Sequence, residues 1–297
     1  MLLALLKKTY IILFNFIENI SKKFRLRKYF KNGRIPWSVG YTDYRIDLIK
    51  EILEDDNINN KFISRNLEPG FGIGVDERII EYPWILSRLS KDKTTFLDAG
   101  STFNFDFILN LPLIIQKDLT ICTFSPEENN YNQKRISYVY ADLRELPFKN
   151  EYFDEIVCQS TLEHINMDNS IYGYKNTISG KDDSKSYEYL IAVKELMRVL
   201  KKGGLLIFSF PFGKFENHGF FQQFDDEMLG RLIELLEPVG TLKLDFMRYT
   251  PEGWIFTSRE ECKDIVSYNP HTGIGKGTDG AAHCRSICFI HFIKVQI

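Results

Sequence analysis

The sequence predicts an α/β protein built on a doubly wound, mostly parallel β-sheet. Beyond residue 93, short apolar segments of strand length alternate with helical segments, as in sheets whose parallel strands are joined by crossover helices. The first of these segments ends in Asp98-Ala99-Gly100, which is typical of a buried strand that leads its backbone into a ligand-binding turn. Two strand-like segments near the C-terminus, 241–249 and 286–295, have no strong helix between them. We therefore expect them to form an antiparallel pair at one edge of the sheet.

The composition is that of an ordinary globular protein. The 297 residues, of which 44% are hydrophobic and 26% charged, suffice for one large domain or one domain with appendages. The net charge of −2 creates no overall field that would attract nucleic acid, so we expect no nucleic-acid partner. The five cysteines form no CxxC pair and no dense framework, which favours reduced thiols and a cytoplasmic location.

Residues 1–34 are predicted to form a basic, amphipathic helical arm. They hold nine of the 38 basic residues and only one of the 40 acidic residues, so the rest of the chain is strongly acidic. Lys7 and Lys8 interrupt the apolar run, which is then too short to span a bilayer and unlike a signal-peptide core. Two interpretations stay open. The arm lies on an anionic membrane surface at the inner face of the membrane, or it docks on protein.

Residues 35–92 are expected to form a helical lead-in and lid. Helices are predicted over 44–57 and 77–89, with a loop between them that contains Gly70, Gly72 and Gly74. No strand precedes this loop, so it favours a flexible lid segment over a phosphate-binding turn.

Residues 93–297 are expected to form the ligand-binding domain. Parallel strands are predicted at 96–99, 119–124, 136–140, 153–159 and 205–210. A helix is predicted to begin at Ser125-Pro126-Glu127-Glu128, where a proline and two acids stand in the first turn. Another, over 187–200, ends in two lysines and two glycines, which are typical of a helix C-terminus.

Polar or small residues follow the carboxyl ends of successive predicted strands, where ligands bind in open α/β sheets. Asp142 can accept a hydrogen bond from the exocyclic amine of a purine. Each residue alone could be a loop residue or a helix cap, but their joint placement predicts a nucleotide-like ligand. The candidate ligand-binding residues are Asp98, Gly100, Ser101, Thr123, Asp142, Leu143 and Ser160.

Over residues 94–212, roughly, the sequence resembles the class I S-adenosylmethionine-dependent methyltransferases, of the type 11-like kind. The similar segments are Leu97–Ser101, Tyr140–Leu143, Leu146–Val157, Ser160–His164 and Val199–Leu206. The resemblance implies a Rossmann-like fold and S-adenosyl-L-methionine as cofactor. It also implies that Asp98, Gly100 and Ser101 hold the methionine part and that Asp142 contacts the adenine.

Three positions depart from the family pattern. Thr102 and Asn104 stand where further glycines are usual, and Thr123 stands where an acid usually binds the ribose hydroxyls. A threonine hydroxyl can still bind ribose, and Glu127 lies close by in the sequence. Over two further groups of residues, 76–84 and 167–169 with 222–224, the chain resembles methyltransferases associated with bacterial surface glycans.

Methyl transfer from a sulfonium requires correct positioning and, for a hydroxyl acceptor, a base of near-neutral pKa. His164 follows the fourth predicted strand and is the expected general base, with Glu163 orienting substrate or helping to hold the cofactor. Both could instead be residues of the pocket wall or of a helix start.

Other polar residues have weaker predicted roles. His218 could line the acceptor pocket or lie in a solvent-exposed loop. His271, Asp279 and His283 show no standard ligand spacing, so no metal is expected. The polar insert 169–186 is expected to cover the acceptor site as a mobile loop or to be simply disordered.

The favoured function is O-methylation of a sugar or another small acceptor in polysaccharide biosynthesis. One alternative is a membrane-associated binding protein that has lost its cofactor site, which would be consistent with Thr102, Asn104 and Thr123. Another is a nicotinamide-dependent oxidoreductase, which the missing G-x-G-x-x-G motif disfavours.

Overall fold

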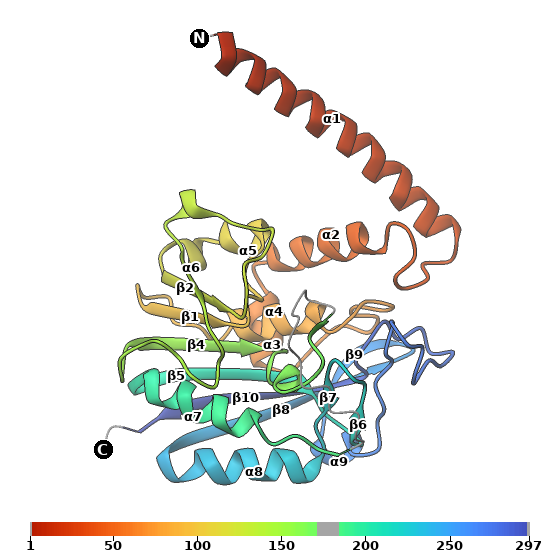
Figure 1. Cartoon of the computed structure of the whole chain (residues 1–297). Coiled ribbons are helices and arrows are strands. Elements are labelled where there is room, and N and C mark those ends of the chain that lie inside the picture. Colours follow the sequence, from red (N-terminus) through yellow and green to blue (C-terminus); the bar gives the residue numbers. More distant parts are fainter. Residues whose placement is uncertain (1, 171–183, 296–297) are drawn as a thin grey trace.

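An eight-stranded sheet runs through the molecule in the order β3-β2-β1-β4-β5-β10-β8-β9 (Figure 1). The computed structural model describes residues 2–170 and 184–295. The strands are β1 (Thr95–Ala99), β2 (Asp118–Thr123), β3 (Ser137–Tyr140), β4 (Phe153–Gln159), β5 (Leu200–Pro211), β8 (Gly240–Thr250), β9 (Gly253–Thr257) and β10 (Ser286–Lys294). Strands β1 to β5 pair parallel with one another, and β10 is antiparallel to both β5 and β8. The predicted fold class, a mostly parallel sheet with an antiparallel C-terminal pair, is confirmed.

Two elements differ from the prediction. Strand β9, which was not predicted, pairs antiparallel with β8 and forms the outer edge of the sheet. The helix predicted from Ser125 is wrong, since the chain leaves β2 in irregular structure and forms a single 3-10 turn at Asn132–Lys134. The side chain of Glu127 explains the difference, because it is hydrogen-bonded to residues that follow β1 and end β2.

The helices before the sheet are α1 (Leu2–Lys31), α2 (Tyr41–Leu53), α3 (Ile58–Ile63) and α4 (Arg78–Leu86). The helix predicted over 44–57 is present as α2, which begins earlier and ends at Leu53; the separate α3 follows it. The later helices are α5 (Asp106–Leu109), α6 (Pro112–Ile115), α7 (Tyr189–Val199), α8 (Asp226–Leu236) and α9 (Arg259–Cys262). A separate two-stranded ribbon is formed by β6 (Glu216–Asn217) and β7 (Gln222–Gln223).

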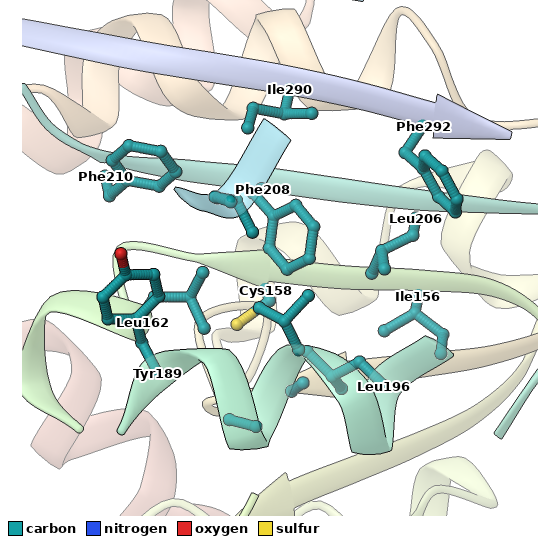
Figure 2. Close-up of a cluster of buried hydrophobic side chains, with 14 of the residues drawn as sticks. Ile156, Cys158, Leu162, Tyr189, Leu196, Leu206, Phe208, Phe210, Ile290 and Phe292 are labelled. Carbon is teal, nitrogen blue, oxygen red and sulfur yellow. The ribbon is translucent and has the colours of Figure 1, made fainter. Parts of the chain in front are cut away.

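Each face of the sheet has its own hydrophobic core. Because side chains alternate along a strand, Ile156 and Cys158 of β4 belong to the core under α7 and α8, while Val157 belongs to the opposite core. Figure 2 shows the first core, in which Leu196 of α7 lies against strands β4, β5 and β10. The second core is covered by α2 to α6, so helices lie on both faces as in a doubly wound fold.

Helix α4 belongs to the second core. Trp84 is 1% exposed and stacks on Phe289 of β10, with ring centroids 4.6 Å apart. Its indole nitrogen donates to the Asp245 carboxylate at 2.9 Å. The segment expected to be a lead-in therefore provides much of the cover of one sheet face.

Helix α1 extends away from the body (Figure 1), and its C-terminal half contacts α2. Arg25 donates to Asp43 of α2 at 2.6 Å, and Tyr29 is buried against Tyr41. The predicted helical arm is thus present as a helix. Among the described residues, no helix is sufficiently long and apolar to cross a membrane.

Candidate active site

A cavity of about 420 Å³ opens at the carboxyl ends of the parallel strands. A volume of this size lies in the range of small-molecule and cofactor sites. Its wall includes six of the seven residues predicted to bind the cofactor: Gly100, Ser101, Thr123, Asp142, Leu143 and Ser160. The topology places them together because each follows or ends a parallel strand, and these strands all end at the same edge of the sheet.

Asp98, the seventh predicted residue, is fully buried and does not line the cavity. Its carboxylate accepts hydrogen bonds from the backbone N–H groups of Thr102 at 3.1 Å and Phe103 at 2.8 Å, and from the Thr102 hydroxyl. Burial raises the pKa of Asp98 to about 7, although these donors act in the opposite direction. Asp98 therefore holds the turn after β1 in shape from behind.

The turn itself has an unusual backbone. Gly100 has φ of +124° and Ser101 has φ of +62°, both in the left-handed region. Ser160, at the end of β4, also has a positive φ of +39°. Non-glycine residues with such angles cost on the order of 1–3 kcal/mol each and are concentrated at functional sites. The turns after β1 and β4 are therefore strained at Ser101 and Ser160.

Glu127 supplies the carboxylate that the sequence lacks at the end of β2. It lies on the cavity wall and accepts hydrogen bonds from Ser101 at 2.8 Å, Asn104 at 3.1 Å and Thr123 at 3.1 Å. Asn104 and Thr123 are two of the three positions at which the sequence departs from the family pattern. They form one network around a single acid.

Asp142 lies on the same wall in a close pair with Arg144. The Arg144 guanidinium donates to its carboxylate at 2.7–3.1 Å. Burial alone would raise the pKa of Asp142, but the Arg144 hydrogen bonds outweigh it and lower that pKa, so the carboxylate is ionised at neutral pH. It remains a hydrogen-bond acceptor toward the cavity.

A second cavity, of about 180 Å³, adjoins the first. The two share Arg78, Ser160 and His164 in their walls. The remaining wall of the second cavity combines aromatic rings with acids and histidines, among them Trp37, Asp76, Glu77, Glu163, Phe220, Phe221, His271 and His283.

His164 therefore stands between the two cavities. Its Nδ1 lies 2.7 Å from the Phe220 carbonyl oxygen, which can only accept, so Nδ1 carries the hydrogen and Nε2 carries the lone pair. Burial lowers the pKa of His164 to about 4, and the nearby His283 and Arg78 act in the same direction. The imidazole is neutral at physiological pH.

Glu163 lies in the wall of the second cavity and is 2% exposed. Burial raises its pKa well above the ordinary value, and the charges of Glu81 and Glu77 add to the effect. Burial thus favours the protonated form of the carboxyl group, which can donate a hydrogen bond. Glu163 and His164 form a 3-10 turn (Leu162–His164) after β4.

A buried polar network that was not predicted from the sequence is centred on Glu81 of α4. Its carboxylate accepts from the Ser160 and Ser209 hydroxyls, each at 2.6 Å, and pairs with Arg78 one turn earlier. This network links α4 to the ends of β4 and β5. The i,i+3 spacing of Arg78 and Glu81 was visible in the sequence, but the same spacing is common in surface pairs.

His218 is not the solvent-exposed residue that one interpretation expected. It is 5% exposed, stacks on Phe221 with centroids 4.3 Å apart, and lies outside the lining of both cavities. The insert expected to cover the site falls largely on residues 171–183, outside the described part of the chain.

The family model described as a methyltransferase domain matches residues 118–208, which run from β2 through most of β5. The chain carries an S-adenosylmethionine-dependent methyltransferase domain. Its cofactor is S-adenosylmethionine, so the 420 Å³ cavity at the strand ends is the candidate cofactor site of the methyltransferase. This assignment favours the methyltransferase over the oxidoreductase and the binding protein that the sequence left open.

Solved structures that match the methyltransferase are distant. YcgJ from Bacillus subtilis is 13% identical, with a TM-score of 0.44, and the match covers 72% of this chain and 97% of YcgJ. The 1,6-didemethyltoxoflavin-N1-methyltransferase of Burkholderia thailandensis, solved with S-adenosylhomocysteine, is 13% identical, with a TM-score of 0.45, over 86% of this chain and 90% of its own. No curated protein matches the sequence. Similarities this low leave the acceptor undecided.

Proposed function

We propose that the methyltransferase methylates a hydroxyl group of a sugar or similar small, polar acceptor. The observation that carries this proposal is the meeting of two cavities at His164. One has the size and position of a cofactor site, and the other is smaller and lined by rings and acids. A methyl group and its acceptor oxygen must come into contact for in-line transfer, and the shared wall is where that can happen.

The lining of the second cavity supports a hydroxylated acceptor. Trp37, Phe220 and Phe221 offer apolar faces, while Asp76 and Glu77 offer carboxylates that accept hydrogen bonds from hydroxyl groups. Sugars present the same two kinds of surface, C–H faces and a rim of hydroxyls. We infer that the cavity binds a single sugar unit or a molecule of that size.

His164 is proposed as the general base. Its neutral imidazole, with the lone pair on Nε2, can accept the proton that an acceptor hydroxyl loses as its oxygen attacks the methyl carbon. The protonated Glu163 beside it is proposed to donate a hydrogen bond that orients the acceptor.

The cofactor-binding roles are likewise proposals. Gly100 and Ser101 would border the methionine part, Glu127 and Thr123 the ribose, and Asp142 with Leu143 the adenine. When bound, S-adenosylmethionine supplies a methyl group already activated by the sulfonium charge. The residues of this chain need only bind and orient it, exclude water, and remove the acceptor proton.

The experiment that tests the proposal has two arms. Calorimetry with S-adenosylmethionine measures cofactor binding directly. Release of S-adenosylhomocysteine is then measured with a panel of nucleotide sugars and free sugars, and the position of the new methyl group is read by NMR.

The variant His164→Gln is expected to keep cofactor binding and to lose turnover by about a hundredfold or more. The matched control His291→Gln lies on β10, outside both cavities, and should leave turnover unchanged. Unchanged turnover in His164→Gln would exclude the general-base role.

We also propose that α1 holds the methyltransferase at the inner face of an anionic membrane. Large apolar side chains of this helix are exposed, including Phe16 at 61% and Phe24 at 64%. Basic residues lie on the same helix, among them Lys23, Arg27 and Lys28. Apolar insertion and electrostatic attraction together support binding to such a surface.

Co-sedimentation with vesicles tests this second proposal. The full chain should pellet with phosphatidylglycerol vesicles at low salt but not with pure phosphatidylcholine, and Phe16→Asp with Phe24→Asp should abolish the binding. The control Ile63→Asp changes an exposed apolar residue of α3 and should have no effect. Equal binding to both lipids would show that electrostatic attraction does not contribute to membrane binding. No binding to either lipid would refute the proposal.

A further inference from the structure

We propose that Glu77, His283 and Cys284 bind a divalent transition-metal ion in the wall of the second cavity, with Zn²⁺ the best match. The ligand atoms that these three side chains can offer all lie within 4.8 Å of one another. Glu77 immediately precedes α4, and His283 and Cys284 precede β10. The fold therefore brings together ligands that are far apart in the sequence, which is why no ligand spacing was visible there.

The carboxylate of Glu77 gives an independent reason to expect a cation. Glu77 is 5% exposed, and its Oε2 has no hydrogen-bond partner among the described residues. A buried carboxylate oxygen without a partner is costly. A bound metal ion would satisfy it.

His283 is held in the orientation that metal-binding histidines adopt. Its Nδ1 lies 2.9 Å from the Tyr268 carbonyl oxygen, so Nδ1 carries the hydrogen and Nε2 is left as the ligand atom. Histidines that bind metals usually donate their other ring N–H to a carboxylate or a backbone carbonyl in this way.

The donor set selects the type of metal. One thiolate, one imidazole and one carboxylate suit Zn²⁺ and related transition metals, whereas Mg²⁺ and Ca²⁺ prefer oxygen ligands alone. Tetrahedral Zn²⁺ with bonds of about 2.0–2.3 Å requires its ligand atoms to be about 3.3–3.7 Å apart. Since the ligand atoms already lie within 4.8 Å of one another, the side chains need to close by no more than about 1.5 Å.

The site has room for a fourth ligand. Among the described residues, the group contains three candidate ligands, and all three line the second cavity. Three protein ligands with an open position are typical of catalytic rather than structural zinc sites. An ion there could polarise an acceptor hydroxyl. This role of the ion rests on the proposed function, whereas the proposal that the ion binds does not.

Titration of the metal-stripped full chain with Co²⁺, followed by absorbance, tests the site. One equivalent should produce a thiolate-to-cobalt charge-transfer band together with the intense visible bands of tetrahedral Co²⁺, and Zn²⁺ should abolish both. The variant Cys284→Ser should lose the charge-transfer band. The control Cys262→Ser, which changes another buried cysteine, should keep it. Glu77→Gln should weaken Co²⁺ affinity by at least about tenfold, in line with the loss of a charged ligand.

Circular dichroism and a second variant distinguish the loss of metal binding from the loss of folding. Circular dichroism without metal establishes that each variant is folded, and Glu77→Gln, which is nearly isosteric, remains informative if Cys284→Ser is not. Absence of the charge-transfer band in the wild-type chain, or its persistence in folded Cys284→Ser, would overturn the proposal. Neither S-adenosylmethionine nor an acceptor is present, so failure here would leave the proposed methyl transfer intact.

Discussion

Gly100 illustrates how one residue can fix the geometry of the cofactor cavity. A β-carbon added there would lie 2.1 Å from the Thr161 hydroxyl oxygen, on a backbone whose φ is +124°. Glycine is thus required at this position for two reasons. Its backbone adopts a positive φ, and the turns after β1 and β4 approach each other too closely for a β-carbon. The two turns together form one edge of the cavity.

We predict that Gly100→Ala destabilises the fold by about 2–4 kcal/mol, because backbone strain and the overlap with Thr161 add together. Cofactor binding should fall below detection by calorimetry. The control is Gly230→Ala in α8, where an added β-carbon meets nothing within 4 Å. Alanine there should stabilise the protein by up to about 1 kcal/mol. Urea denaturation measures both, and a neutral Gly100→Ala would contradict the described turn.

Glu127 leads to a second residue-level prediction. Glu127→Gln should weaken S-adenosylmethionine binding by about tenfold to a hundredfold, the usual loss when a charged hydrogen-bond acceptor becomes neutral. The adjacent exposed residue provides the control, since Glu128→Gln changes the same charge without a contact to the β1 turn. Isothermal titration calorimetry measures the affinity of both variants for S-adenosylmethionine. Equal affinities would exclude a ribose contact by Glu127.

The pH dependence of turnover should reflect the buried His164. Because its pKa is lowered to about 4, the imidazole stays neutral well below pH 6.5, although it is a weaker base than an ordinary histidine. We expect the acid limb of the kcat/KM profile near pH 4 rather than near the ordinary histidine value. The free energy of unfolding is highest above pH 6.5, where His164 is neutral in both the folded and the unfolded chain. It decreases as the pH falls toward 4, because the unfolded chain binds the proton more readily than the folded chain does. Circular dichroism at each pH separates unfolding from titration, and a limb near pH 6.5 would refute the assignment.

At the scale of elements, α4 connects the hydrophobic core to the site. Its first turn holds Glu81, which accepts hydrogen bonds from residues at the ends of β4 and β5, and its last turn holds Trp84 against β10. Arg88, just beyond the helix, lies over the Trp84 ring at 3.7 Å and donates to Asp245 at 3.0 Å. One short helix thus couples packing on the sheet to the polar groups of both cavities.

We predict that Trp84→Ala destabilises the protein by about 3–5 kcal/mol, as is usual when a large buried aromatic side chain is removed. The site should suffer as well, since the position of α4 determines that of Glu81. The control Ile115→Ala removes a side chain that is 66% exposed and should change the free energy of unfolding by less than about 0.5 kcal/mol. A loss below about 1 kcal/mol in Trp84→Ala would contradict the packing.

The sequence alone predicted the parallel strands well and the connections poorly. Strands such as β5 are buried on both faces over most of their length, so they appear as largely apolar runs that are easy to recognise. The segment around Glu127 was predicted as a helix because local preferences favoured one, and contacts with distant residues overrode them. The second cavity could not be predicted, because its wall combines residues from both ends of the chain, such as Trp37 and His283.

On the scale of the whole molecule, residues 35–92 and 93–297 share one core. Val75, Ile80 and Trp84 from the first segment pack with Met247 and Phe289 from the second. A domain boundary drawn at residue 93 from sequence pattern would therefore pass through the hydrophobic core. The boundary at residue 34 separates far less buried surface, since α1 contacts the body mainly through Tyr29 and a few ion pairs.

We therefore predict different behaviour for two truncated chains. Residues 93–297 should bind a hydrophobic dye and aggregate, because the apolar face of the sheet loses its cover. Residues 35–297 should fold cooperatively and bind S-adenosylmethionine. Size-exclusion chromatography and thermal melting compare the two, and a monomeric 93–297 fragment with a cooperative melt would refute the shared core.

The place of β10 in the sheet has a consequence for how the protein is made. This strand is among the last residues of the chain, yet it lies between β5 and β8 and pairs with both. While the chain is still on the ribosome, β5 and β8 can be complete and still lack their shared neighbour, which leaves two unpaired strand edges. Closure of the sheet must wait until β10 has been made, so this methyltransferase depends on protection of those edges during synthesis more than a protein whose neighbouring strands are made in succession.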